Sequence, residues 1–368
     1  MKTIHWVQSA VAVAMPLLMA IPVRAAEPVA PMGNDTPEAT ASSSGALSAV
    51  SGGQAVCCDS GAYDGYLKCD GDDCPQFECY WFSGVDSFKG VSDGNYDANS
   101  GLFTGLNSGF ALPVLCKYGI GGQAGMSCGI YDLAGRASQS DVSPGQDQQQ
   151  VFVTAGIFRR ADANCPISAG IVYDWMFDNN FGGYGAAPTL GQLRGQIAYD
   201  LNDCNEVGVW GTYRGQSFGN SFGANGYPLE FRAVDQVDLF WHHKFGECGA
   251  DGRLYVGLPT ADRLTQTNTG FSSAGFGGKP GSVIMGANCE APLNDRLSLF
   301  ANGTYMAPDQ AAGATAAAQE TWNFSFGINV YLGRSRSRCP TVAGNSFLPY
   351  LPVANNGSFL VDTNETQP

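Results

Sequence analysis

The sequence predicts an all-β protein, an antiparallel up-and-down β-barrel of about twelve strands of the outer-membrane type, with an irregular cysteine-rich segment before it. Three observations predict this fold. Apolar and polar residues alternate from about residue 151 to 332, which is the two-residue period of a strand with one apolar and one polar face. The connections between these stretches alternate between short and long, and a cysteine recurs near most of the short ones.

The alternation is clear in residues 166–178, where Ile171 and Tyr173 fall on one face and Asp174 falls on the other. No segment shows a sustained helical period of 3.6 residues. The predicted strands are 80–89, 101–112, 118–133, 149–160, 166–178, 190–201, 206–215, 231–245, 252–258, 281–288, 294–306 and 321–332.

The connections also indicate a barrel. Those that carry cysteine are short, namely 161–165, 202–205 and 246–251. The others are longer and rich in glycine and asparagine, namely 179–189, 216–230, 259–280 and 307–320. Short turns at one end and long loops at the other are typical of outer-membrane barrels, whose short turns face the periplasm. An even number of strands then places both ends of the strand region, beside Cys79 and Cys339, at the short-turn end.

The strand region has distinct flanks. A positive charge at Lys2, an apolar run and small residues near Ala25 are typical of a cleaved secretory signal peptide. The expected organisation is a signal peptide over 1–26, an Ala/Ser/Pro-rich disordered linker over 27–56, a cysteine-rich segment over 57–79, the barrel over 80–332 and an irregular C-terminal tail over 333–368.

The composition limits which partners the protein can bind and indicates the compartment in which it folds. A net charge of -14 argues against a nucleic-acid partner, which requires a basic face to neutralise phosphates. Twelve cysteines in an exported chain indicate an oxidising compartment and disulfides. The disulfide candidates are Cys57, Cys58, Cys69, Cys74, Cys79, Cys116, Cys128, Cys165, Cys204, Cys248, Cys289 and Cys339. We expect the turn cysteines to share one end of the barrel, and at least one bridge to join residues 57–79 to a turn.

The polar faces of the strands carry charges of both signs. The candidates for lining the lumen are Asp174, Asp178, Arg194, Asp200, Glu206, Arg214, Arg232, Asp238, Arg253 and Arg296. They form either a polar conduit or ligand pocket, or a set of cross-strand ion pairs that fill the barrel, because twelve strands lie between small filled barrels and large open ones. If the apolar faces of the strands meet lipid, an arginine at a neighbouring lumenal position such as Ser168 or Gln196 should cost little.

No catalytic, cofactor-binding or metal-binding residue is predicted. The N-terminal cysteines lack the paired spacing of structural zinc sites, so disulfides are the better interpretation. Residues 90–94 match the letters of a serine-hydrolase motif around Ser92, but no helix follows, as that motif requires.

Three stretches resemble an uncharacterised family of exported planctomycete proteins, which look like porin-like cell-envelope β-barrels with a domain of unknown function. These stretches are residues 80–86, 150–160 and 172–178. The resemblance covers roughly residues 80–340 and carries no catalytic residues to transfer.

The functional expectation is a barrel of the outer membrane or cell envelope, porin-like or structural, with turns braced by disulfides, and not an enzyme. Outer-membrane lipid is the expected partner, small polar solutes are a second candidate, and no cofactor is expected. The alternative is a soluble exported cell-surface β-protein with an adhesive or structural role. A more distant alternative is a barrel hydrolase that uses Ser92 or another hydroxyl.

Overall fold

The computed structural model describes most of the chain from residue 77 onward. The described residues are 77–90, 93, 98–133, 147–161, 165–182, 185–202, 204–222, 227–245, 249–262, 264, 279–309, 320–332 and 347–364. Residues 1–55 and 56–368 form two separate units, and all described residues belong to the second. No helix within these ranges is long and apolar enough to cross a membrane.

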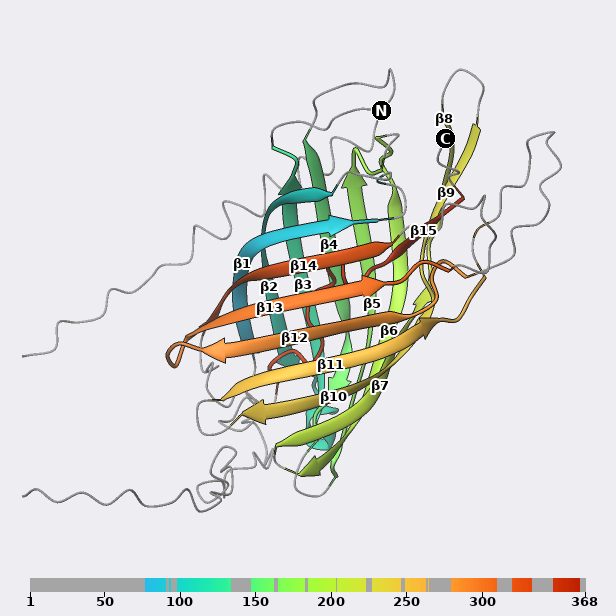
Figure 1. Cartoon of the computed structure of the whole chain (residues 1–368). Coiled ribbons are helices and arrows are strands. Elements are labelled where there is room, and N and C mark those ends of the chain that lie inside the picture. Colours follow the sequence, from blue (N-terminus) through green and yellow to red (C-terminus); the bar gives the residue numbers. More distant parts are fainter. Residues whose placement is uncertain are drawn as a thin grey trace, which may run out of the picture. The chain divides into compact units, whose positions relative to one another are not determined.

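Twelve antiparallel strands close into a barrel (Figure 1). The strands are β1 (Phe77–Lys89), β2 (Asn99–Ala111), β3 (Ile120–Tyr131), β4 (Gln148–Arg159), β5 (Ile167–Asn179), β6 (Thr189–Asn202), β7 (Asn205–Arg214), β10 (Gln236–Phe245), β11 (Ala250–Pro259), β12 (Ile284–Pro292), β13 (Leu297–Met306) and β14 (Thr321–Leu332). The first and last strands pair in register from Cys79 opposite Leu332 to Lys89 opposite Trp322, which closes the ring. The predicted fold class is therefore confirmed.

The sequence located all twelve barrel strands, and both bounds of β14 agree with the prediction. The main difference lies at 231–245, which the sequence predicted as one strand. The chain interrupts it at Val234 and Asp235, so β9 (Tyr227–Ala233) leaves the barrel wall and only β10 stays in it. With β8 (Phe218–Phe222) and β15 (Val361–Thr363), β9 forms a second, three-stranded sheet.

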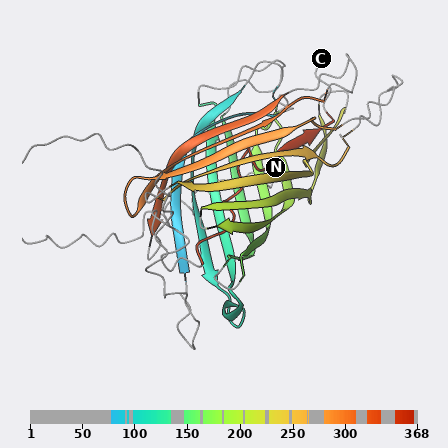
Figure 2. The same cartoon turned by 60° about the horizontal axis from the view of Figure 1, so that its bottom comes forward.

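The barrel has two distinct ends. β1 begins and β14 ends at the short-turn end. The same end holds five connections, namely 112–119, 160–166, 203–204, 246–249 and 293–296. At the long-loop end lie the connections that follow β1, β3, β5, β7, β11 and β13, including the β8–β9 excursion. The predicted asymmetry of the connections is confirmed, and Figure 2 gives a second view of the ring.

The outer face is apolar and open to the surroundings. Leu239 is 62% exposed, Phe326 54% and Ile171 45%, although each sits in the middle of a regular strand. Large apolar side chains are also exposed on β6, β7, β11, β12 and β13. An apolar band around a whole monomer is far larger than the patches found on soluble proteins, so this face is built to meet an apolar phase.

Candidate functional site

The lumen is occupied by the protein's own C-terminal segment. Residues 347–364, here called the lumenal segment, pass along the inner face of the barrel (Figures 1 and 2). Apart from β15 the segment has no regular secondary structure, so its backbone polar groups need partners from the wall. The side chains of Phe347, Leu351 and Phe359 are buried to within 3% exposure.

The segment enters at the short-turn end. A Cβ atom at Gly109 of β2 would lie 1.9 Å from the Phe347 carbonyl oxygen, so only glycine lets the segment pass this close to the wall. Arg160, which follows β4, donates to the Leu348 carbonyl at 3.0 Å and to the Pro349 carbonyl at 2.8 Å. Desolvation lowers the pKa of Arg160, while Tyr350 and Glu206 raise it, and the arginine keeps its charge.

Two buried amide side chains of the wall form hydrogen bonds with the next part of the segment. The Gln123 side chain donates to the Leu351 carbonyl at 2.9 Å, and its own oxygen accepts from the Tyr350 and Leu351 backbone amides at 3.1 Å each. Asn107 donates to the same Leu351 carbonyl at 3.0 Å. Both wall side chains are almost fully buried. Water cannot reach them, so the segment supplies hydrogen-bond partners that they would otherwise lack. The contacts fix the backbone rather than a particular side chain of the segment.

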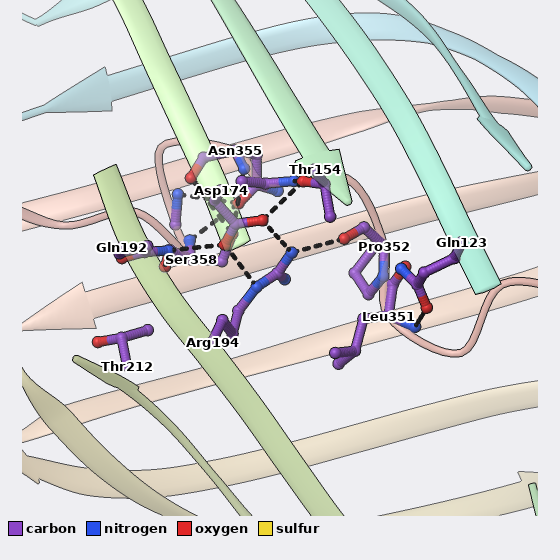
Figure 3. A network of polar contacts seen from close by, with 12 residues as sticks. Gln123, Thr154, Asp174, Gln192, Arg194, Thr212, Leu351, Pro352, Asn355 and Ser358 are labelled. Carbon is purple, nitrogen blue, oxygen red and sulfur yellow. Dashed lines mark hydrogen bonds and ion pairs between the residues drawn. The ribbon is translucent and has the colours of Figure 1, made fainter. Parts of the chain in front are cut away.

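A buried ion pair stands at mid-height (Figure 3). Arg194 of β6 binds both carboxylate oxygens of Asp174 of β5, at 2.9 and 3.1 Å, and donates to the Pro352 carbonyl at 2.7 Å. Thr154 donates to Asp174 at 2.7 Å and accepts from the Ala354 amide at 3.0 Å. A two-pronged geometry of this kind satisfies a buried charge, and here it also holds the segment.

The upper part of the segment is held in the same way. Gln192 of β6 donates to Asp174 at 3.0 Å and to the Ser358 carbonyl at 2.9 Å. On the opposite wall Asn356 donates to Asp86 of β1 at 3.0 Å. That carboxylate also accepts from Tyr131 at 3.0 Å, so wall and segment share one network.

The segment leaves the lumen at the long-loop end. There β15 pairs antiparallel with β9, with Val361 opposite Ala233 and Thr363 opposite Phe231. Arg232 forms an ion pair with Asp362 at 3.1 Å. The second sheet therefore ties the exit of the lumenal segment to the excursion between β7 and β10.

The structure places the predicted lumen-lining residues in three groups. The inner faces of the strands carry Asp174, Asp178, Arg194, Asp200, Glu206, Asp238 and Arg253. Arg214, at the end of β7, forms an ion pair with Asp235 at 3.2 Å, and Arg232 belongs to β9 rather than to the barrel wall. Arg296 is exposed in the turn after β12, so its prediction as a lumenal residue is wrong. Its strand begins at Leu297, three residues later than predicted.

Most inward charges pair with the wall or with the lumenal segment. Asp178 accepts from Gln148 at 2.8 Å, and Glu206 binds His242 at 3.2 Å. The expectation that arginine is tolerated at Ser168 and Gln196 is also revised. Ser168 accepts from the Ala161 amide, and Gln196 donates to Tyr350 of the segment at 2.7 Å, so neither side chain faces open water.

Several residues of this site escaped the sequence prediction. Asn107, Gln123, Thr154 and Gln192 are uncharged and do not stand out among the polar positions of their strands. The segment itself carried a usable signal, because the apolar run 347–354 interrupts an otherwise polar tail. A single sequence does not say that this run returns into the barrel.

The cysteines agree with the predicted placement but not with complete pairing. Cys79, Cys116, Cys165, Cys204 and Cys289 all lie at the short-turn end. Cys204 is disulfide-bonded. Cys79, Cys128 and Cys289 carry free thiols, which contradicts the pairing predicted for them, since their cross-strand neighbours are not cysteines. Cys57, Cys58, Cys69, Cys74, Cys248 and Cys339 lie outside the described residues, so the structure tests the expected bridge from residues 57–79 only at Cys79, which forms none.

The described residues contain no cluster of His, Cys, Asp or Glu arranged to hold a metal ion. Ser92, the hydroxyl named for the hydrolase alternative, lies outside the described ranges.

Comparison with known proteins gives a family without an activity. A family model described as "Family of unknown function (DUF6666)" matches residues 78–361, a range that begins in β1 and ends in β15. It therefore includes residues 347–361 of the lumenal segment. No curated protein matches the chain. The resemblance to a family of unknown function is confirmed, while its planctomycete source and its export stay predictions.

Solved structures give distant likenesses. The NanC porin is 9% identical, over 69% of this chain and 100% of that chain, with a TM-score of 0.39. Outer membrane phospholipase A from Escherichia coli is 10% identical, over 69% and 95%, with a TM-score of 0.36. The toluene transporter TodX of P. putida is 10% identical, over 71% and 89%, with a TM-score of 0.34. Values this low transfer no activity, and the closed barrel rests on its own strand register.

Proposed function

We propose a function from geometry alone, because this chain belongs to the Family of unknown function (DUF6666), whose description names no activity. The barrel spans the outer membrane, its lumen is closed by residues 347–364, and its role is structural rather than conducting. The observation that carries this proposal is the continuous set of buried hydrogen bonds between the wall and the lumenal segment.

The outer face supports the membrane location. The outward positions of β5 from Ile167 to Phe177 rise about 25 Å along the barrel axis, at about 3.3 Å per residue and a tilt of about 40°. This height matches the apolar band of outer-membrane barrels, about 25 Å. Two aromatic side chains from the middle of their strands reach toward the two borders with their polar atoms. Tyr173 accepts from the Gln216 amide near the long-loop end, and Trp241 donates to Asn205 near the short-turn end.

The filled lumen argues for a structural role. A porin needs a water-filled path, but the lumenal side chains of Gln123, Asp174 and Gln192 are each at most 1% exposed. Because the lumen is filled, passage of small polar solutes is not proposed for the closed barrel. Membrane lipid is the proposed partner, because the outer face is apolar. The proposed localisation is the outer membrane of the cell envelope, reached through the predicted signal peptide over 1–26.

Fractionation and reconstitution test this function directly. We expect the full-length chain to fractionate with outer membranes, to require detergent for extraction, and to give no conductance steps in a planar lipid bilayer. Recovery of a soluble monomer without detergent would refute the membrane location. Steady conductance of the wild-type protein would instead refute the closed lumen, so the two parts of the proposal fail separately.

A charge on the outer belt should be costly only at membrane depth. Leu239 sits in the middle of β10, whereas Leu201, similarly exposed, sits near the short-turn end of β6. Leu239→Arg is expected to lower the free energy of unfolding by about 2–4 kcal/mol, and Leu201→Arg by about 0–1 kcal/mol, because the cost depends on depth in the bilayer. Urea titrations in lipid vesicles measure both values. Equal costs at the two positions would contradict the membrane belt.

A further inference from the structure

We infer that the barrel carries its own chain across the membrane, so that the residues after Asn364 start on the side opposite to the start of β1. The inference rests on the proposed membrane location, and it assigns the two ends of the described chain to different sides. A barrel with twelve strands alone would leave both ends of its wall on one side.

The contacts of the segment advance in one direction. Phe347 lies against Gly109, close to the short-turn end of β2. Leu351 is held by Gln123, three residues above the start of β3. Pro352 meets Arg194 at mid-height of β6. The segment therefore moves steadily away from the short-turn end.

The direction continues to the opposite rim. Asn356 binds Asp86, three residues before the end of β1, and Ser358 binds Gln192, three residues after the start of β6. β15 then pairs with β9, and the Asn364 side chain accepts from the Glu230 amide at 2.8 Å. Residues 347 and 364 thus lie at opposite ends of the lumen.

The chain that follows cannot return by the same path. Four residues span at most about 14 Å, which is less than the height of the apolar band, about 25 Å. The lumen is also already filled by the segment. Anything attached after Pro368 therefore begins at the long-loop end. Short turns face the periplasm in outer-membrane barrels, so this end faces the outside.

Three matched epitope insertions test the inference in cells that produce the full-length protein. One short tag follows Pro368, one lies between Pro75 and Gln76 just before β1, and one lies between Gly223 and Ala224 in the β8–β9 connection. Antibody binding is compared between intact and permeabilised cells, and heat-modifiable mobility on gels identifies the folded barrel of each variant. We expect the tags after Pro368 and at Gly223 to bind equally in intact cells, and the tag before β1 to bind only after permeabilisation.

Each other outcome overturns a definite part. If the tag after Pro368 is hidden together with the tag before β1 while the Gly223 tag is accessible, the segment does not cross, and the membrane barrel stands. If the Gly223 tag is hidden in intact cells, the orientation is wrong. If all three tags bind in intact cells, or the protein is recovered without detergent, the membrane location itself fails. If a folded barrel forms only without the Pro368 tag, a lysine is inserted after Pro368 and labelled with an impermeant amine reagent, and peptide mass mapping distinguishes its label from that on the exposed Lys279.

Discussion

Deletion of residues 347–368 is expected to turn a silent barrel into a conducting one. The wall strands pair with one another around the closed ring without this segment, and the Asp174–Arg194 pair joins two residues of the wall. The polar groups released on Asn107, Gln123 and Gln192 would then bind water, because an unpaired buried polar group costs about 1–3 kcal/mol. Single-channel recording in a planar bilayer should show discrete steps for the shortened chain and none for the wild type.

A point variant provides a second test of the same expectation in case the shortened chain does not fold. Gly109→Ala places a methyl group against the Phe347 carbonyl, and the nearest atoms all belong to the segment rather than to the wall. It should displace the start of the segment and give intermittent conductance from a folded barrel. Gly195→Ala is the matched control on β6, because its nearest atom is 3.9 Å from the added carbon. A folded, silent Gly109→Ala barrel together with a folded, silent deletion would show that the segment does not close the pore.

The second large effect concerns the buried ion pair. Asp174→Ala is expected to lower the free energy of unfolding by about 3–5 kcal/mol, because it leaves the Arg194 charge buried without its partner. Arg194 is 3% exposed and Asp174 is fully buried, so water cannot take the partner's place. Urea titration of the protein in lipid vesicles measures the change.

A double variant distinguishes the cost of removing one partner of the ion pair from the cost of replacing both partners. Asp174→Ala combined with Arg194→Met should recover much of the loss, since replacing a buried pair by apolar side chains is often nearly neutral. Lys279→Met is the control, because the Lys279–Asp262 pair is exposed and such pairs contribute about 0–1 kcal/mol. Equal losses for Asp174→Ala and Lys279→Met would contradict the role given to the buried pair.

Much of the wall could be predicted because it obeys a local rule. In β14 every second side chain is apolar and faces outward, and the polar ones between face the lumen, so the period alone located Thr321 and Leu332 as its bounds. The prediction of a single strand over 231–245 was wrong, although the alternation is interrupted inside it by the apolar pair Ala233–Val234 and the polar pair Asp235–Gln236. The break there is set by long-range bonds, since the Val234 amide donates to the Leu360 carbonyl.

The site was harder to predict because its members are far apart in the chain. Asp174 and Arg194 were proposed as lumenal charges from their faces, and the register places Arg194 opposite Val172, which brings the two charges together. Gln123 carried no such signal, because its role depends on a backbone carbonyl 228 residues away.

The sequence by itself determined the strands, their two faces, the asymmetric connections and the twelve-strand ring, since each follows from patterns a few residues long. Only the tertiary structure decided that the lumen is filled, which charges pair, and where the chain leaves the barrel. Residues 347–364 have almost no regular secondary structure and hence no period to recognise. Their position is fixed by the shape of the lumen and by the buried polar side chains of its wall. Both of these exist only once the ring of strands has closed.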